Sequence, residues 1–95
     1  MSYKLEFKRL ALKEWKKLDP TIQAQFKKKL QQRLKEPHVK SARISGGKDL
    51  YKIKLRQLGY RLVYKVDDKI ITVTVLAIGK RERNGVYITA INRLP

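Results

Sequence analysis

The segment Tyr51–Val66, YKIKLRQLGYRLVYKV, decides the fold of this 95-residue chain. Apolar residues alternate with mostly basic ones on both sides of its centre, which is the two-residue period of a strand with one buried face. The central residues Gln57-Leu58-Gly59 are typical of a tight turn, so the segment is predicted to form an antiparallel hairpin. A register slip of one residue would put Arg61 among the core side chains, which is costly. The favoured register pairs Leu55 with Tyr60, Ile53 with Leu62 and Tyr51 with Tyr64, and sets Lys54 opposite Arg61.

Two further strands are predicted beside this hairpin. Ile70–Ile78 is β-branched almost throughout, as a central strand should be, and it follows the turn residues Asp67-Asp68-Lys69. Near the start of the chain, Ser2–Lys8 alternates apolar with charged residues and is predicted to be a half-buried strand.

Two helices are predicted between the first strand and the hairpin. Arg9–Leu18 has apolar residues at helical spacing, among them Trp15, which is expected in the core. The second helix begins at Asp19-Pro20, because Asp can cap an exposed N–H group and Pro suits the first turn. It ends at Glu36-Pro37, since the residue before Pro disfavours the helical region. The stretch His38–Asp49 has no clear period and is predicted to be a loop.

The element order is therefore strand, helix, helix and three strands, within a single domain that spans residues 1–95. We expect an α+β fold in which a helical hairpin packs on a mainly antiparallel four-stranded sheet. The tail from Arg81 onward is either a short helix or an irregular arm, because Asn84-Gly85 and the β-branched residues after it weaken a helix.

Charge gives the first indication of function. The 24 Lys and Arg residues against 8 Asp and Glu give a formal net charge of +16, with the excess present in both halves of the chain. Such a protein attracts polyanions, of which nucleic acid is one. Cys is absent and His38 is the single histidine, which excludes thiolate metal sites, a cysteine nucleophile and a two-histidine acid–base pair. We therefore expect neither a metal nor another cofactor.

The sequence has no apolar run of the ~20 residues that a membrane span needs, and no signal-peptide core. A cytoplasmic protein without a membrane partner is expected.

The basic face of the hairpin is the strongest candidate site. The predicted register puts Lys52, Lys54 and Arg61 on one face of the sheet, and Arg81 and Arg83 follow the next strand nearby. Facing cations without a carboxylate between them cost stability, which an anionic ligand such as a phosphate would offset. Neighbouring cations also lower the pKa of a lysine, so it could act as a base toward a ribose 2′-hydroxyl. The alternative interpretation is that Lys52, Lys54 and Arg56 are simply the solvated face of an amphipathic strand.

Other candidates have two interpretations each. Lys27-Lys28-Lys29 on the second helix is either a solvated face or a contact to a nucleic-acid backbone. Tyr87 either packs in the core, or stacks on a base or hydrogen-bonds a reacting hydroxyl. The segment Gly46-Gly47-Lys48-Asp49 lacks the spacing of a phosphate-binding glycine loop.

The chain resembles the RelE family of bacterial messenger-RNA interferase toxins, in the RelE/ParE superfamily, over essentially its whole length. The residues that carry the resemblance are YKIKLR at 51–56, GYRLVY at 59–64, GKRER at 79–83 with Val86-Tyr87, ALKEWKKL at 11–18 and KKKL at 27–30. The resemblance implies a compact α+β toxin that cleaves messenger RNA in the ribosomal A site, by attack of a 2′-hydroxyl on the adjacent phosphodiester and without a metal.

The resemblance also implies roles for particular residues. Lys52 and Lys54 would supply base and electrostatic functions, Arg61 would stabilise the transition state and Arg81 would assist the leaving 5′-oxygen. Tyr87 would stack on or orient the nucleotide and is a further candidate base, so the division of base duty stays open. The residues expected to bind RNA or the ribosome are Lys27, Lys28, Lys29, Arg56 and Arg83.

Implied partners are the ribosome, through A-site messenger and ribosomal RNA, and a RelB-like antitoxin, with operator DNA reached only through the antitoxin complex. Self-repulsion favours a monomeric free toxin. Two rival functions remain: a ParE-like toxin that inhibits DNA gyrase, and a non-catalytic basic RNA-binding module.

Overall fold

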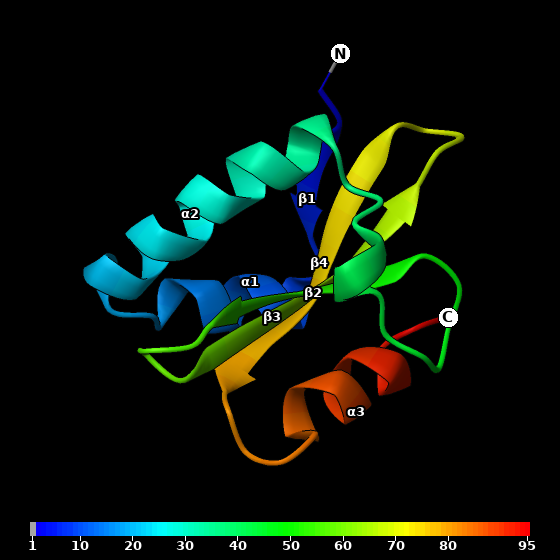
Figure 1. Cartoon of the computed structure of the whole chain (residues 1–95). Helices are drawn as coiled ribbons and strands as arrows, with labels where there is room; N and C mark the ends of the chain where they lie inside the picture. Colours follow the sequence, from blue (N-terminus) through cyan, green and yellow to red (C-terminus); the bar gives the residue numbers. More distant parts are fainter. Residues whose placement is uncertain (1) are drawn as a thin grey trace.

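The predicted hairpin is present in the computed structural model, which describes residues 2–95 (Figure 1). Its two strands are β2 (Leu50–Leu55) and β3 (Tyr60–Asp67). They pair antiparallel in the predicted register, with Leu55 opposite Tyr60, Ile53 opposite Leu62 and Lys54 opposite Arg61. Gly59 in the connecting turn has φ +70°, a left-handed conformation that favours glycine.

The hairpin belongs to a sheet with the strand order β1-β4-β3-β2. β4 (Thr72–Lys80) pairs antiparallel with β3, while β1 (Lys4–Phe7) pairs parallel with β4. The expected mainly antiparallel, four-stranded sheet is thereby confirmed. β1 covers only the first part of β4, since its last residue, Phe7, lies opposite Val75.

β4 begins two residues later than the β-branched pattern predicted, and it ends at Lys80 instead of Ile78. The turn extends further than expected because the Asp67 carboxylate accepts hydrogen bonds from the Lys69 and Ile70 N–H groups. Ile71 has φ +50°, which is unfavourable for a β-branched residue, and it is 40% exposed. The strand was predicted to begin at Ile70 because Ile70 and Ile71 are β-branched, but both residues are exposed and belong to the turn.

A bulge interrupts the pairing of β3 with β4. Val63 pairs with Ala77 and Tyr64 with Val75, which leaves Leu76 without a partner on β3. Leu76 and Ala77 consequently pack in the same buried cluster, whereas Val75 and Ile78 pack in the other. Strict alternation of side chains, on which the sequence prediction relied, fails at this point.

The helical hairpin covers one face of the sheet, as expected (Figure 1). It consists of α1 (Arg9–Lys16) and α2 (Pro20–Lys35). The Asp19 carboxylate caps α2 by accepting from the Thr21 N–H at 2.9 Å. The apolar stripe of α2 contributes Ile22, Phe26 and Leu30 to the core, and Trp15 is partly buried against that core, with its ring 5.4 Å from that of Phe7.

The tail is a helix, α3 (Gly85–Asn92), and it lies on the opposite face of the sheet from α1 and α2 (Figure 1). Its buried residues Val86 and Ala90 pack on a second apolar cluster that contains Val63 and Leu76. Tertiary packing thus stabilises a segment that weak helical propensity left undecided. The predicted loop before β2 holds a single short 3-10 turn, Lys40–Ala42.

His38 is part of a polar network at the end of the sheet where Tyr51 lies. Its Nε2 lies 2.9 Å from the Asp68 carboxylate and its Nδ1 lies 3.1 Å from the Tyr51 hydroxyl. Tyr3 donates a second hydrogen bond to Asp68 at 2.6 Å. These contacts link the residue before β1, the start of β2 and the β3–β4 turn through His38 and Asp68.

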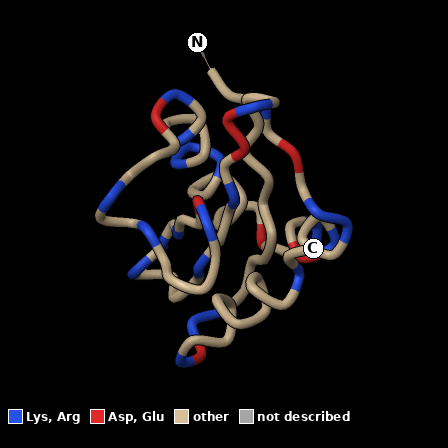
Figure 2. Tube along the Cα trace, turned by 90° about the vertical axis from the view of Figure 1, so that its right-hand side faces the viewer, with Lys and Arg blue, Asp and Glu red and all other residues tan. Residues whose placement is uncertain are grey.

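Lys and Arg residues are spread over helices, strands and loops, as Figure 2 shows, in agreement with the charge in both halves of the sequence. Among the described residues, no helix has the length and apolar character required to cross a membrane.

Candidate active site

A row of residues across three strands forms the centre of the candidate site. Lys54 on β2 lies opposite Arg61 on β3, and Arg61 lies opposite Gly79 on β4. Lys52 is one pleat further along β2 and points to the same face, which is the face that α3 covers. A Cβ atom at Gly79 would lie only 3.3 Å from a Val86 methyl group, so glycine here allows α3 to pack close to the cations.

A pocket of about 240 Å³ opens at the end of this row. The structure brings four cationic side chains to it, while its remaining lining is Leu55, Gly59 and Tyr60; the cations are Lys54, Arg56, Arg61 and Arg81. Within residues 2–95, the ion pairs are His38–Asp68 and Glu14–Arg93, so no carboxylate lies within ion-pair distance of these four side chains. Such a pocket matches the charge and size of a phosphodiester.

The positive charges of the cluster change the pKa of Lys54. The positive charge of Lys52 lowers the pKa of Lys54, and partial desolvation and the charges of Arg61, Arg56 and Arg81 lower it further. The direction is the one expected from the sequence. A lower pKa increases the fraction of neutral amine near neutral pH, which is the form that can accept a proton.

α3 brings Tyr87 to the same cations. Its ring centre lies 5.2 Å from the Arg61 guanidinium carbon and 5.8 Å from the Lys52 Nζ atom, within the range of cation–π contacts. The Tyr87 hydroxyl is buried and has no hydrogen-bond partner among the described residues. The ring therefore lies at the site, although Tyr87 also packs against the second apolar cluster.

Two hydrogen bonds connect the segment between β4 and α3 to the β2–β3 hairpin. The Arg81 N–H donates to the Gly59 carbonyl at 2.7 Å, which holds this segment beside the β2–β3 turn. Arg61 Nη1 donates to the Arg83 carbonyl at 3.2 Å. Arg83 has φ +53°, an unfavourable conformation that concentrates strain next to the cation cluster.

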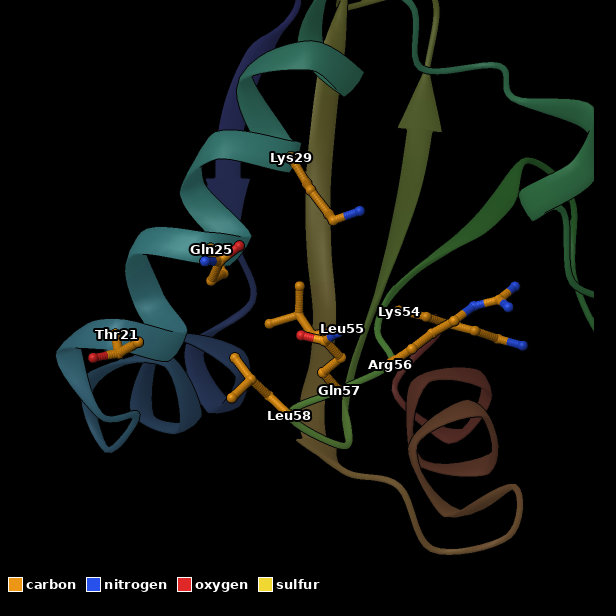
Figure 3. A pocket seen from close by; sticks show the side chains of 8 residues that line it. All are labelled: Thr21, Gln25, Lys29, Lys54, Leu55, Arg56, Gln57 and Leu58. Carbon is orange, nitrogen blue, oxygen red and sulfur yellow. The ribbon is translucent and has the colours of Figure 1, made fainter.

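The three consecutive lysines of α2 do not share one surface. Lys29 lines a pocket of about 390 Å³ together with Lys54 and Arg56, which both extend away from α2 in Figure 3. Lys27 lines a groove on another side of the helix, with Phe7 and Trp15. Consecutive helical residues point in directions about 100° apart, so only Lys29 extends the candidate site.

A third pocket beside the site could not be predicted from the sequence. It has a volume of about 390 Å³ and lies next to Lys52 and Tyr87. The rest of its lining comes from the loop before β2 and from α3 with the residue before it: Arg43, Ile44, Ser45, Asn84, Ile88 and Ile91. The loop has no periodicity that could have placed it there. Among residues 2–95, no three His, Cys, Asp or Glu side chains gather in a way that could hold a metal ion.

Comparison with known proteins gives consistent results. Residues 5–85 match the family model described as the ParE toxin of type II toxin–antitoxin systems. The chain is 49% identical over 94 residues, 99% of both chains, to a protein of Escherichia coli (strain K12) named mRNA interferase toxin RelE.

Two solved structures agree with the fold. A mutant of the Escherichia coli toxin RelE in the free state matches with a TM-score of 0.91 and 46% identity, covering 100% of both chains. The toxin in the intact Escherichia coli RelBE toxin–antitoxin complex matches with a TM-score of 0.83 and 49% identity, covering 86% of this chain and 100% of that one.

Proposed function

This chain belongs to the ParE toxin family of type II toxin–antitoxin systems, and we propose that it is a RelE-like toxin that cleaves messenger RNA in the ribosomal A site. The relative at 49% identity is named an mRNA interferase toxin, and the identity extends over 99% of both chains. A ribosome-dependent endoribonuclease is the function that this relationship and the geometry support best.

The observation that carries the proposal is a cation cluster that has no carboxylate at ion-pair distance in the described part of the chain. The pocket at Lys54, Arg61 and Arg81 concentrates positive charge where stability alone would favour neutralisation. The cleavage of a phosphodiester builds negative charge on the non-bridging and leaving oxygens, and fixed cations stabilise that charge without reorganisation. A gyrase inhibitor would have no need of this arrangement.

The chemistry assigned to the site is transesterification within the RNA. The 2′-oxygen forms a bond to the adjacent phosphorus while the bond from phosphorus to the 5′-oxygen breaks. The products are a 2′,3′-cyclic phosphate and a 5′-hydroxyl. Lys54 accepts the 2′-hydroxyl proton, because the neighbouring cations lower its pKa and so increase the fraction of neutral amine that can take a proton. Lys52 contributes positive charge beside it.

The remaining roles follow from position. Arg61, opposite Lys54, neutralises charge on the non-bridging oxygens. Arg81 stabilises the leaving 5′-oxygen by charge, and the proton that this oxygen needs comes from solvent, since guanidinium releases protons reluctantly. The Tyr87 ring orients the nucleotide by stacking, and its contacts with Lys52 and Arg61 hold it at the cluster.

The site lacks a conventional acid–base pair, so we assign part of the catalysis to positioning of the codon by the ribosome. Fixing the reacting atoms in place can lower a barrier by several kcal/mol, roughly 7–11 at the most favourable. Arg56 and Lys29 extend the positive surface beyond the pocket and are assigned to RNA backbone contacts. Arg83, Lys27 and Lys28 are assigned to ribosomal RNA on the basis of charge alone.

The partner chain that neutralises this toxin is a RelB-like antitoxin. The toxins of RelBE complexes share its fold, at 49% identity for the intact Escherichia coli complex. We expect the free toxin to be a monomer, because its charge of +16 opposes self-association. We expect it to be cytoplasmic, because its proposed substrate is messenger RNA on the ribosome. Contact with operator DNA would occur through the antitoxin complex.

The proposal is tested with ribosomes that carry a defined codon in the A site. Cleavage within that codon, without added metal and with a 2′,3′-cyclic phosphate at the new end, is the expected result. The same messenger without ribosomes should be cut far more slowly. Intact messenger together with inhibition of DNA gyrase would replace the proposal by the ParE-like function. Ribosome binding without either activity would favour a non-catalytic RNA-binding module.

A further inference from the structure

The outer edge of β4 changes its hydrogen-bonding partners halfway along. β1 ends at Phe7, and the Lys8 N–H donates to the Val75 carbonyl. From the bulge residue Leu76 onward, side chains take over. Arg93 Nη1 donates to the Leu76 carbonyl at 2.8 Å, and Glu14 Oε1 accepts from the Ile78 N–H at 3.1 Å.

These two side chains also bind each other at two points. Arg93 Nη1 lies 2.8 Å from Glu14 Oε1, and Arg93 Nη2 lies 3.1 Å from Glu14 Oε2. The side chains are only 18% and 31% exposed, respectively. An exposed ion pair contributes little to stability, whereas a partly buried, two-point pair that also satisfies backbone groups fixes the geometry of everything it joins.

The pair joins elements from opposite faces of the sheet. Glu14 is on α1, which packs on the first face, and Arg93 is the residue that ends α3 on the second face. α3 has only 8 residues, and an isolated helix of that length is unstable in water. Its position therefore depends on the packing of Val86 and Ala90 and on this anchor at its C-terminal end.

Tyr87 is the residue whose position depends on that anchor. It lies near the start of α3, and its ring contacts Lys52 and Arg61 across the candidate site. The segment before α3 is exposed and turns through the strained residue Arg83. A helix released at its far end could pivot on this turn and carry the ring away from the cations.

We infer that Glu14 and Arg93 form a latch around the edge of β4 that holds α3 against the sheet and so positions Tyr87 over Lys52 and Arg61. The inference rests on the proposed function, because the role assigned to the latch is to hold the nucleotide-binding side of the cleavage site in place. Glu14 and Arg93 are positioning residues, since neither lines the cation pocket.

Three substitutions weaken the latch by different amounts. Glu14→Gln keeps an acceptor for the Ile78 N–H but removes the charge, so it has the least effect on folding. Arg93→Met removes both the charge and the contact to the Leu76 carbonyl. Arg93→Lys keeps the charge but cannot reproduce the two-point contact, so an intermediate effect is expected. His38→Gln is the matched control, because it breaks the other ion pair, which lies outside α1 and α3.

The first measurement is the proton chemical shift of the Lys52 ε-methylene group in the folded free protein. The Tyr87 ring should shift this signal upfield, because Lys52 Nζ lies 5.8 Å from the ring centre, and Tyr87→Leu defines the value without a ring. In Glu14→Gln and Arg93→Met the upfield shift should fall by more than half, while His38→Gln should retain it. An unchanged shift in both latch variants would overturn the inference, whether or not the protein cleaves messenger RNA.

The second measurement is cleavage on programmed ribosomes. The latch variants should lose roughly 10-fold in rate at saturating ribosomes, with less than about a two-fold change in the half-saturating ribosome concentration. Full activity in Glu14→Gln together with a displaced Tyr87 signal would overturn the positioning role. If the unaltered protein cleaves nothing on ribosomes, the proposed function fails, and the chemical shift still decides whether the latch holds Tyr87.

Discussion

Lys54 and Arg61 lie directly opposite each other on β2 and β3, and neither has a carboxylate within ion-pair distance among the described residues. Like charges in facing positions destabilise a sheet. The fold keeps these two cations opposite each other, although the chain has 8 acidic residues that could have offset the repulsion. We interpret the repulsion as the energetic cost of a phosphate-binding site, and the predictions below follow from it.

Arg61→Ala should reduce A-site cleavage by roughly 10²–10³-fold, the usual effect of removing one group that stabilises transition-state charge. Lys65→Ala is the matched control, because Lys65 is a cation on the same strand and face that lies outside the pocket. The measurement is single-turnover cleavage at saturating ribosomes, with ribosome affinity determined separately. If both variants lost cleavage only in proportion to their lost ribosome affinity, the result would favour a surface that binds RNA without cleaving it.

Lys54→Met should raise the melting temperature at about pH 7 and abolish most cleavage. The native state holds Lys54 at a lowered pKa, mainly through Lys52, so its charged form is destabilising. The folded protein then binds fewer protons than the unfolded one, and stability rises as pH increases through the folded pKa toward the ordinary value.

Thermal melts over this alkaline range should therefore show a rise for the unaltered protein that Lys54→Met lacks. In cleavage assays, Lys54→Arg should remain inactive as pH increases, since guanidinium stays protonated. Activity of Lys54→Arg close to that of the unaltered protein would exclude Lys54 as the base and leave Lys52 and Tyr87 as candidates.

Tyr87→Phe should leave the free energy of unfolding unchanged or raise it by up to about 1 kcal/mol, because it removes a buried hydroxyl that has no hydrogen-bond partner within residues 2–95. If Tyr87 acts by stacking, Tyr87→Phe should keep cleavage within about three-fold, whereas Tyr87→Ala should lose roughly 1–3 kcal/mol of nucleotide stacking. Chemical denaturation and ribosome cleavage assays measure the two effects. A Tyr87→Phe variant as inactive as Tyr87→Ala would assign chemistry to the hydroxyl.

Ile71→Gly should stabilise the protein by about 1 kcal/mol, because a left-handed backbone costs a residue with a side chain roughly 1–2 kcal/mol. Ile71 has φ +50° and is partly exposed, so little buried surface is lost. Ile70→Gly is the control: Ile70 is not among the residues with positive φ, and the added flexibility should destabilise it slightly. Denaturant titration of both variants gives the comparison, and a loss of stability in Ile71→Gly would contradict the strain argument.

The sequence by itself determined the hairpin and its register. Period-two alternation leaves one face for the core, and the cost of burying Arg61 leaves one pairing, so the juxtaposition of Lys54 and Arg61 could be predicted from local rules. The capped start of α2 at Asp19 is equally local, because a side chain and a backbone N–H two residues apart decide it.

Only the tertiary structure decided where Tyr87 lies. Its segment has weak helical propensity, and the packing of Val86 and Ala90 on the second face of the sheet makes it a helix. The bulge at Leu76 and the contact of Glu14 with Arg93 join residues far apart in the chain, so no periodicity encodes them. Local patterns fix which side chains face which way along one strand, whereas long-range packing decides which elements are then brought against them.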